Sequence, residues 1–188
     1  MEAPNQQRRL VVEGGESIVD FDNKAFKPIP QAGIDLAVKA MNAGVMYRYQ
    51  PKSKEDSLTA SFEHDFAQYM GVKHAVGTNS CGSAMFIALN IVGVQPGDTV
   101  LTNAFTFHAV PSVIEHARAV PVLVESNREW AMDPKDLDKK ATETGAKVLL
   151  MSYMRGHVPD MDAIMKVVEK HGLILIEDCA HAYATLWN

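Results

Sequence analysis

Two carboxylates and a histidine follow an apolar run near the end of the sequence. Leu173 to Ile176 are apolar, Glu177 and Asp178 come directly after them, and His181 stands three residues beyond Asp178. An apolar run of this length after a helix-like segment predicts a strand buried on both faces of a parallel sheet. Open α/β sheets bind ligands at the carboxyl ends of their strands, where Asp178 would lie. On spacing alone, Asp178 as the N-cap of a following helix is an alternative.

A turn of small polar residues, Gly77-Thr-Asn-Ser-Cys-Gly-Ser83, stands between a predicted strand and a predicted helix. Backbone N–H groups at a helix N-terminus bind phosphate, and small side chains let the phosphate approach. The turn lacks the Gly-Lys-Ser/Thr ending of a Walker A loop, and the sequence has no G-x-G-x-x-G fingerprint. Many such turns bind nothing, so this turn alone does not decide the function.

Aromatic and basic residues follow two further predicted strands. Phe105 and Phe107 could stack on a planar ligand, or they could simply fill the core. Arg155 could bind an anion, pair with an acid or lie in solvent. His157 has no second ligand at a metal-binding spacing, so no metal site is predicted.

Together these groups place a phosphate cradle, a stacking ring and a carboxylate at the strand ends of one sheet. Pyridoxal 5'-phosphate (PLP) is a planar, phosphorylated, cationic heteroaromatic that needs all three. Its phosphate would lie on the Ser80–Ser83 turn. Asp178 would keep its pyridine nitrogen protonated, which makes the ring an electron sink.

The elements that position these groups alternate between strand and helix. Predicted strands are His74 to Thr78, Thr99 to Thr102, Val120 to Val124, Lys147 to Ser152 and the run after Gly172. Predicted helices are Gln31 to Ala43, one opened by Ser57 and ended by Gly71, Ser80 to Val92, one through Val113 to Ala117, one from Asp133-Pro134 to about Thr142, and one from Asp160 to His171. This pattern predicts an α/β fold, a parallel sheet with helices on both faces and right-handed crossovers.

Composition narrows the class of protein. The 188 residues are 47% hydrophobic and 22% charged with a net charge of -5, which is ordinary for a globular protein. No Lys/Arg cluster indicates nucleic-acid binding, and no apolar run is long enough to span a bilayer. Met1 to Arg9 lack the apolar core of a signal peptide. Cys81 and Cys179 are predicted to be free thiols, so a cytoplasmic protein is expected.

Two regions are predicted along the chain. Residues 1–56 form an N-terminal arm and a helix, and residues 57–188 form an incomplete PLP-binding large domain. The last residues, Tyr183 to Asn188, directly follow a strand end. A buried strand there needs further elements to cover it, so we expect the sequence to be truncated.

From Ser57 to Asn188 the sequence resembles a known family. The matching motifs occur in family order: Phe62-Glu63, Gly71-Val72-Lys73-His74-Ala75-Val76, Asn79-Ser80, Pro96-Gly97-Asp98, Phe105-Thr106-Phe107, Asp160-Met161-Asp162-Ala163 and Glu177-Asp178-Cys179-Ala180-His181-Ala182. They are similar to the DegT/DnrJ/EryC1/StrS sugar aminotransferases, which are PLP enzymes of fold type I, the aspartate-aminotransferase fold. The resemblance implies a cytoplasmic enzyme of sugar biosynthesis, such as that of cell-surface polysaccharides.

The resemblance also implies a role for each matching residue. Asp178 would hold the pyridine nitrogen, His181 would contact the ring hydroxyl, and Phe107 would stack on the ring. Ser80, Cys81 and Gly82 would line the phosphate. The family often has Ser-Gly-Thr at that turn, so one phosphate-binding hydroxyl is missing here, and Ser83 is expected to replace it.

One family residue has no match. The lysine that forms the Schiff base lies beyond the Asp178 motif, and no lysine follows Lys170 in this chain. The chain as given is therefore expected to be inactive. The resemblance implies that the parent enzyme also contains the rest of the large domain and a small C-terminal domain, both absent from this chain. It further implies a homodimer that transfers an amino group from glutamate to a keto-sugar. That sugar would be a nucleotide-linked keto-hexose or an oxidised octulosonate.

Two alternatives stay open. Some relatives carry histidine in place of the Schiff-base lysine and act as PLP-dependent sugar dehydratases. Alternatively, the chain is a non-catalytic binding or interaction module. The residue at the lysine position would separate transamination from dehydration, and PLP binding would test the module hypothesis.

Overall fold

The structure is a computed structural model that describes residues 10–16, 28–44, 47 and 57–187. Most of the predicted N-terminal arm and most of the polar, aromatic segment Val45 to Lys54 lie outside these ranges. The chain divides into two compact units, Met1–Ser57 and Leu58–Asn188. No helix within the described ranges combines the length and the apolar content needed to cross a bilayer.

Among its described residues, the first unit contains a short 3-10 turn, Val11–Glu13, and one α-helix, α1 (Gln31–Ala43). The helix has the predicted bounds, and Gly44 ends it in the left-handed conformation, with φ of 68°. Its apolar residues are exposed, with Ile34 at 43% and Met41 at 58%.

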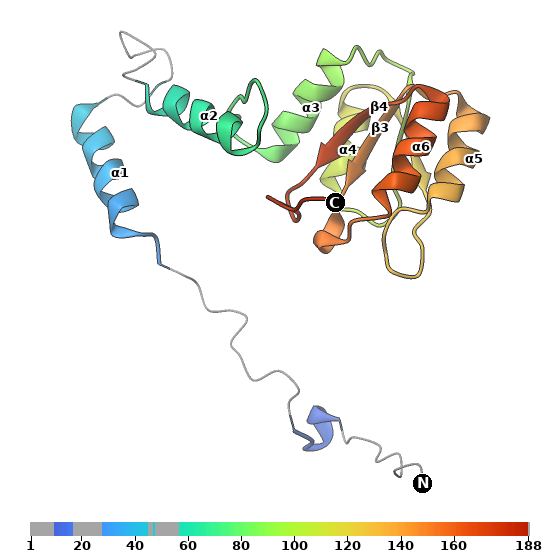
Figure 1. Cartoon of the computed structure of the whole chain (residues 1–188), viewed down its shortest axis with the longest axis horizontal. Helices are drawn as coiled ribbons and strands as arrows, with labels where there is room; N and C mark the ends of the chain where they lie inside the picture. The colour runs from blue at the N-terminus through green and yellow to red at the C-terminus, as the bar shows by residue number, and fades with distance from the viewer. Residues whose placement is uncertain (1–9, 17–27, 45–46, 48–56, 188) are drawn as a thin grey trace. The chain divides into compact units, whose positions relative to one another are not determined.

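The second unit contains the sheet (Figure 1). Its elements in order are α2 (Leu58–Tyr69), α3 (Cys81–Ile91), β1 (Thr99–Asn103), α4 (Ala109–His116), β2 (Val120–Val124), α5 (Pro134–Thr144), β3 (Val148–Ser152), the 3-10 turn η2 (Met154–Gly156), α6 (Met161–His171) and β4 (Ile174–Asp178). This alternation confirms the predicted α/β class. The Asp133 and Asp160 side chains cap α5 and α6 as predicted.

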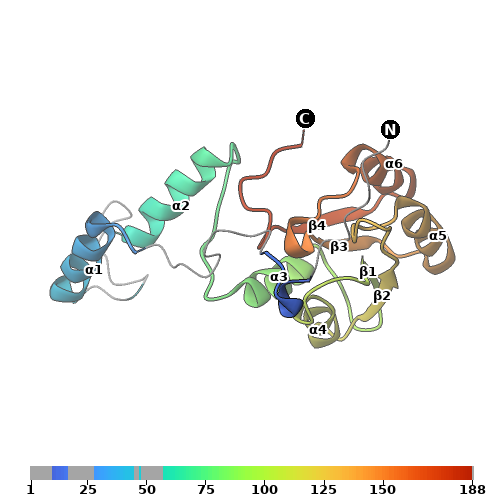
Figure 2. The ribbon, with the colours of Figure 1, turned by 90° about the horizontal axis from the view of Figure 1, so that it is seen from below.

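All four strands are parallel and lie in the order β2-β1-β3-β4. Strand β2 pairs with β1 on one side. The chain then returns across β1 and adds β3 and β4 on the other side. Helices α3 and α4 cover one face and α5 and α6 the other (Figure 2). Right-handed crossovers that run in opposite directions put their helices on opposite faces. The reversal makes the gap between β1 and β3 the switch point where such sheets bind ligands.

The core has two layers that share the central strands. Leu101 and Leu149 face the α5/α6 layer, whereas Val100 and Leu150 face the α3/α4 layer. Every residue of β3 is buried. Burial on both faces, predicted for the strand before Asp178, is therefore a property of β3.

Two details of the predicted fold are wrong. Residues 74–78 form no strand, because no described strand pairs with them and the Gly77 N–H donates to Glu63 Oε1 at 2.6 Å. Strand β4 lies at the sheet edge, so Ile174 and Glu177 are exposed rather than buried. The predicted helix α2 is present, and its apolar residues are largely exposed, with Phe62 at 61%.

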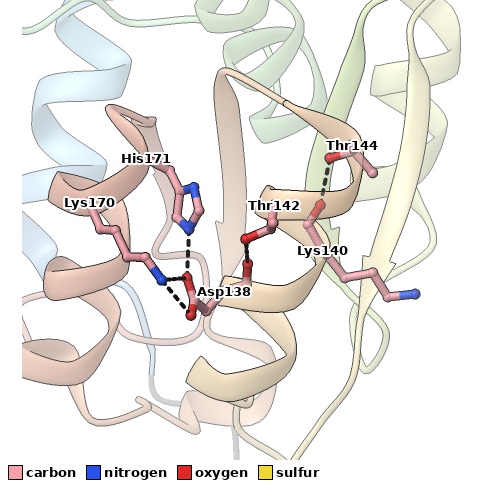
Figure 3. Close-up of polar contacts among 6 residues, drawn as sticks. All are labelled: Asp138, Lys140, Thr142, Thr144, Lys170 and His171. Carbon is pink, nitrogen blue, oxygen red and sulfur yellow. Dashed lines mark hydrogen bonds and ion pairs between the residues drawn. The ribbon is translucent and has the colours of Figure 1, made fainter.

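An acidic side chain joins the two helices of one face (Figure 3). Asp138 on α5 accepts hydrogen bonds from Lys170 Nζ at 2.7 and 2.8 Å and contacts His171 Nε2 at 2.6 Å. Lys170 and His171 occupy the last turn of α6, where a helix dipole favours cations. The hydrogen bond from Lys170, followed by that from His171, lowers the pKa of the Asp138 carboxyl.

Because this pKa is lower in the folded state, Asp138 stabilises the fold above its unfolded pKa of about 3.9 and loses that effect as pH falls through the folded value. We expect Asp138→Asn to lower the Tm near neutral pH and to match the unsubstituted chain in acid. Thermal unfolding followed by circular dichroism across this pH range measures both. Glu143→Gln, which removes an exposed ion pair of 3.9 Å on the same helix, is the control with little expected effect. A Tm difference that did not shrink in acid would contradict the prediction.

Candidate functional site

The carboxyl ends of three adjacent strands form the rim of the candidate site. The ladder between β3 and β4 continues to Ser152 and Asp178, but that between β1 and β3 stops at Thr102 and Leu150. Past that point the Ser152 N–H donates to Asn103 Oδ1 at 2.8 Å. A side chain thus spans the switch point where the ladder has ended.

Asp178 is buried at this rim, with 7% of its surface exposed. Its Oδ2 accepts a hydrogen bond from Ser152 Oγ at 2.8 Å, and its Oδ1 accepts from Ala180 N–H at 3.1 Å. The Cys81 thiol donates to Oδ1 at 3.4 Å. An ionised carboxylate offers about four acceptor positions, so one remains for a ligand. No helix begins among residues 179–187, the described residues after Asp178, so its interpretation as a helix N-cap is wrong.

Cys81 joins the polar turn to this carboxylate across 97 residues of sequence. The pKa of the Cys81 thiol is raised, first by burial, then by the negative charge of Asp178 and the hydrogen bond to it, and last by Cys179. The thiol therefore stays protonated at neutral pH and acts as a donor. The turn and the carboxylate are parts of one site.

The turn itself begins α3. Ser80 is the N-cap, and its Oγ accepts from Ser83 N–H at 3.0 Å and donates to Ser83 Oγ at 3.0 Å. The N–H groups of Cys81 and Gly82 have no acceptor among the residues that the structure describes. A Cβ on Gly82 would meet only Ser80 Oγ, at 3.8 Å, so steric exclusion does not require glycine here. The turn presents two free amides at the positive end of an 11-residue helix.

Phe107 follows β1 and is 51% exposed. Its ring packs against His108, with 4.3 Å between the ring centroids. The alternative that this ring fills the core is therefore wrong. Phe105 is partly buried and packs against Trp130, at 5.1 Å. Among the described residues, no ring contact joins Phe107 to Asp178 or Cys81, so stacking on a ligand stays a prediction.

His181 lies in the turns after β4 and is exposed. Its Nδ1 accepts a hydrogen bond from the backbone N–H of Arg155 at 3.1 Å. Arg155, expected to act through its guanidinium, thus contacts His181 through its main chain. The exposed guanidinium makes no ion pair with any described residue.

Sequence reasoning missed one polar residue of the rim, Ser152, and assigned no role to two others, Tyr153 and Glu177. Each stands at or next to the end of a predicted strand, which is the signal that singled out Asp178. The Tyr153 hydroxyl donates to Glu177 Oε1 and lies 3.5 Å from Met161 Sδ. Burial, and then the hydrogen bond and charge of Glu177, raise the pKa of Tyr153 far above its usual value.

This shift predicts alkaline instability. Because the folded pKa lies above the unfolded value of about 10, the stabilisation is complete below pH 10 and declines at higher pH by up to about 1.4 kcal/mol per pH unit. We expect the Tyr153→Phe chain to lose less free energy of unfolding than the unsubstituted chain between about pH 10 and 11. Urea titrations at those two pH values measure the difference. Equal losses in both chains would refute the assignment.

The sequence is similar to those of known proteins. The family model of the DegT/DnrJ/EryC1/StrS aminotransferase family matches residues 49–188. The spore coat polysaccharide biosynthesis protein SpsC of Bacillus subtilis is 39% identical over 128 residues, which are 68% of this chain and 33% of that protein. GDP-perosamine synthase of Caulobacter vibrioides is 36% identical over 128 residues, 68% of this chain and 34% of that enzyme.

A solved structure gives the same result. The PLP form of the putative sugar aminotransferase Spr1654 of Streptococcus pneumoniae superposes with a TM-score of 0.72 at 29% identity. The match covers 84% of this chain and 42% of that one. It confirms the predicted PLP-dependent transferase fold of type I. The chain spans about a third of the length of the curated relatives it matches.

Proposed function

This chain belongs to the DegT/DnrJ/EryC1/StrS aminotransferase family, and we propose that it provides the cofactor-binding part of a PLP-dependent sugar aminotransferase. The observation that carries the proposal is the contact between Cys81, the first residue of α3, and the buried carboxylate of Asp178. It puts an anion-binding helix terminus next to an acid that can accept one more hydrogen bond. Few ligands other than a phosphorylated pyridinium need both.

The residues present fit PLP at both ends. The free amides of Cys81 and Gly82 and the hydroxyls of Ser80 and Ser83 would hold its phosphate. The remaining acceptor position of Asp178 would hold its protonated pyridine nitrogen. When bound, PLP supplies an electron sink for moving an amino group.

The surroundings of Asp178 suit it to hold the pyridine nitrogen. Ser152 Oγ, Ala180 N–H and the Cys81 thiol all donate to the carboxylate, which fixes its orientation. We further propose that Phe107 covers one face of the ring and that His181 donates to the ring hydroxyl. The half-exposed ring of Phe107 leaves it able to contact a ligand.

We propose a keto-sugar as the amino acceptor, either a nucleotide-linked keto-hexose or an oxidised octulosonate, and glutamate as the donor. Sugar chemistry is supported by the names of the relatives, among them GDP-perosamine synthase. Because the match covers only about a third of the length of those relatives, amino transfer and homodimer formation are proposed for a protein of their full length. The free thiols Cys81 and Cys179 support a reducing, cytoplasmic location.

The first experiment titrates the 188-residue chain with PLP and follows tryptophan fluorescence. Saturable binding that Asp178→Asn weakens supports the proposal, and no binding overturns it. In a second experiment, the protein of the relatives' length is incubated with glutamate and a panel of keto-sugars, and 2-oxoglutarate is measured. An aminated sugar supports transamination, whereas a deoxygenated sugar without 2-oxoglutarate would identify a dehydratase.

A further inference from the structure

The turn after β3 holds an unfavourable backbone conformation next to His181. Arg155 has φ of 58° and ψ of 17° inside η2, in the left-handed region that residues with a Cβ rarely adopt. In this conformation its N–H donates to His181 Nδ1 at 3.1 Å. Strain of this kind persists only where the surrounding structure enforces it, and it is common at functional sites.

A backbone N–H can only donate, so the ring nitrogen that it contacts must offer a lone pair. In a neutral imidazole the proton is then on the other nitrogen, Nε2. We infer that the turn from Tyr153 to Gly156 is a positioning element that holds His181 as its Nε2–H tautomer. The inference assigns a new role to the turn. Its use in catalysis rests on the proposed function.

The turn is itself fixed to β4 at two points. The Tyr153 N–H donates to the carbonyl oxygen of Asp178 at 3.1 Å, and its hydroxyl donates to Glu177. The turn then closes through a hydrogen bond from Gly156 N–H to the Tyr153 carbonyl at 2.8 Å. The position of Arg155 N–H is therefore set by the same strand that carries Asp178.

Gly156 brings the turn close to the His181 backbone as well. It has φ of 78°, and a Cβ at this position would lie 3.3 Å from the His181 carbonyl oxygen. A larger residue would therefore push against the backbone of His181. The turn thus holds the His181 ring by a hydrogen bond and leaves little room for a larger residue beside the His181 carbonyl.

A fixed Nε2–H suits an oxygen acceptor such as a phenolate or a carboxylate. As a neutral ring, His181 would donate to that oxygen without adding a second positive charge beside a protonated pyridine. In the proposed enzyme the acceptor is the ring hydroxyl of the cofactor. Arg155 and Gly156 act through His181 and are positioning residues.

The tautomer is measured directly by NMR of the 188-residue chain labelled with 15N-histidine and kept free of cofactor. His181→Gln identifies the signals of this ring among the seven histidines. We expect two-bond N–H correlations typical of the Nε2–H form in the unsubstituted chain. A predominant Nδ1–H form would overturn the inference.

Two variants test the role of the turn. Gly156→Ala should reduce the Nε2–H population and weaken PLP binding about 10-fold, the loss of one hydrogen bond. Gly145→Ala is the matched control, because it has φ of 63° but no atom within 4 Å of its Cβ position. It should carry the same backbone strain and leave His181 unchanged.

Arg155→Gly relieves the strain but keeps the N–H, so the tautomer should persist. A change in tautomer in this variant, or none in a folded Gly156→Ala chain, would refute the inference. The NMR measurement needs no PLP. A chain that fails to bind PLP would therefore overturn the proposed function and leave the tautomer assignment standing.

Discussion

Replacing Asp178 by asparagine is expected to lower the amino-transfer rate of the longer protein about 10²–10³-fold, the effect of removing one preorganised electrostatic contact. A neutral amide cannot stabilise a protonated pyridine nitrogen, so the ring would lose its pull on electrons. In the 188-residue chain, the same substitution should weaken PLP binding measured by fluorescence. Asp133→Asn is the matched control, since Asn caps a helix as well as Asp does and this cap serves α5.

The same change should also destabilise the fold. Asp178 is buried and accepts from three donors, whereas an asparagine amide must turn its NH₂ group toward at least one of them. We expect a loss of about 1–3 kcal/mol in the free energy of unfolding, measured in urea. Binding and rates must be compared at temperatures where both variants are folded. A folded Asp178→Asn chain that bound PLP normally would exclude this residue as the nitrogen partner.

Replacing Ser80 by alanine is expected to weaken PLP binding by about 10- to 100-fold, the effect of one hydrogen bond to a charged group. Ser80 also caps α3, because its Oγ accepts from Ser83 N–H. The substitution should therefore lower the free energy of unfolding by about 1 kcal/mol as well. Fluorescence titration with PLP and urea denaturation measure the two effects separately.

The matched control for Ser80 is Asp160→Ala. Asp160 caps α6 through the equivalent N–H, that of Ala163, at 3.0 Å. Both variants should lose similar stability, but only Ser80→Ala should lose PLP affinity. Equal affinities in the two variants would show that the α3 terminus does not hold the phosphate.

Local chemistry explains the parts of the fold that the sequence predicted well. Asp133-Pro134 and Asp160 begin helices and Gly172 ends one, because caps depend on residues a few positions apart. Strand pairing depends on distant segments instead. Residues 74–78 have a strand-like sequence but no described neighbour to pair with, and the edge position of β4 follows from the strand order.

The candidate site was also predicted only in part: its residues could be named from the sequence, but their contacts could not. Resemblance to the family selected Asp178, Cys81 and His181 from motifs, but it did not predict what touches them. The contact of Cys81 with Asp178 joins residues 97 positions apart, and that of Arg155 with His181 uses the backbone. Ser152 was missed because a serine that ends a buried strand has no distinctive spacing. Its role emerges only from the register of β3 with β4.

The Asn103 side chain accepts a hydrogen bond from the Ser152 N–H, which affects how this amide exchanges with solvent. The amides paired between β1 and β3 exchange with solvent only when the sheet opens. The Ser152 amide is instead protected by a single side chain, that of Asn103, at the rim. Its deuterium uptake therefore reports local breathing of the gap between β1 and β3, independently of global unfolding. The exchange rate of the Ser152 amide therefore measures how often the rim opens between β1 and β3.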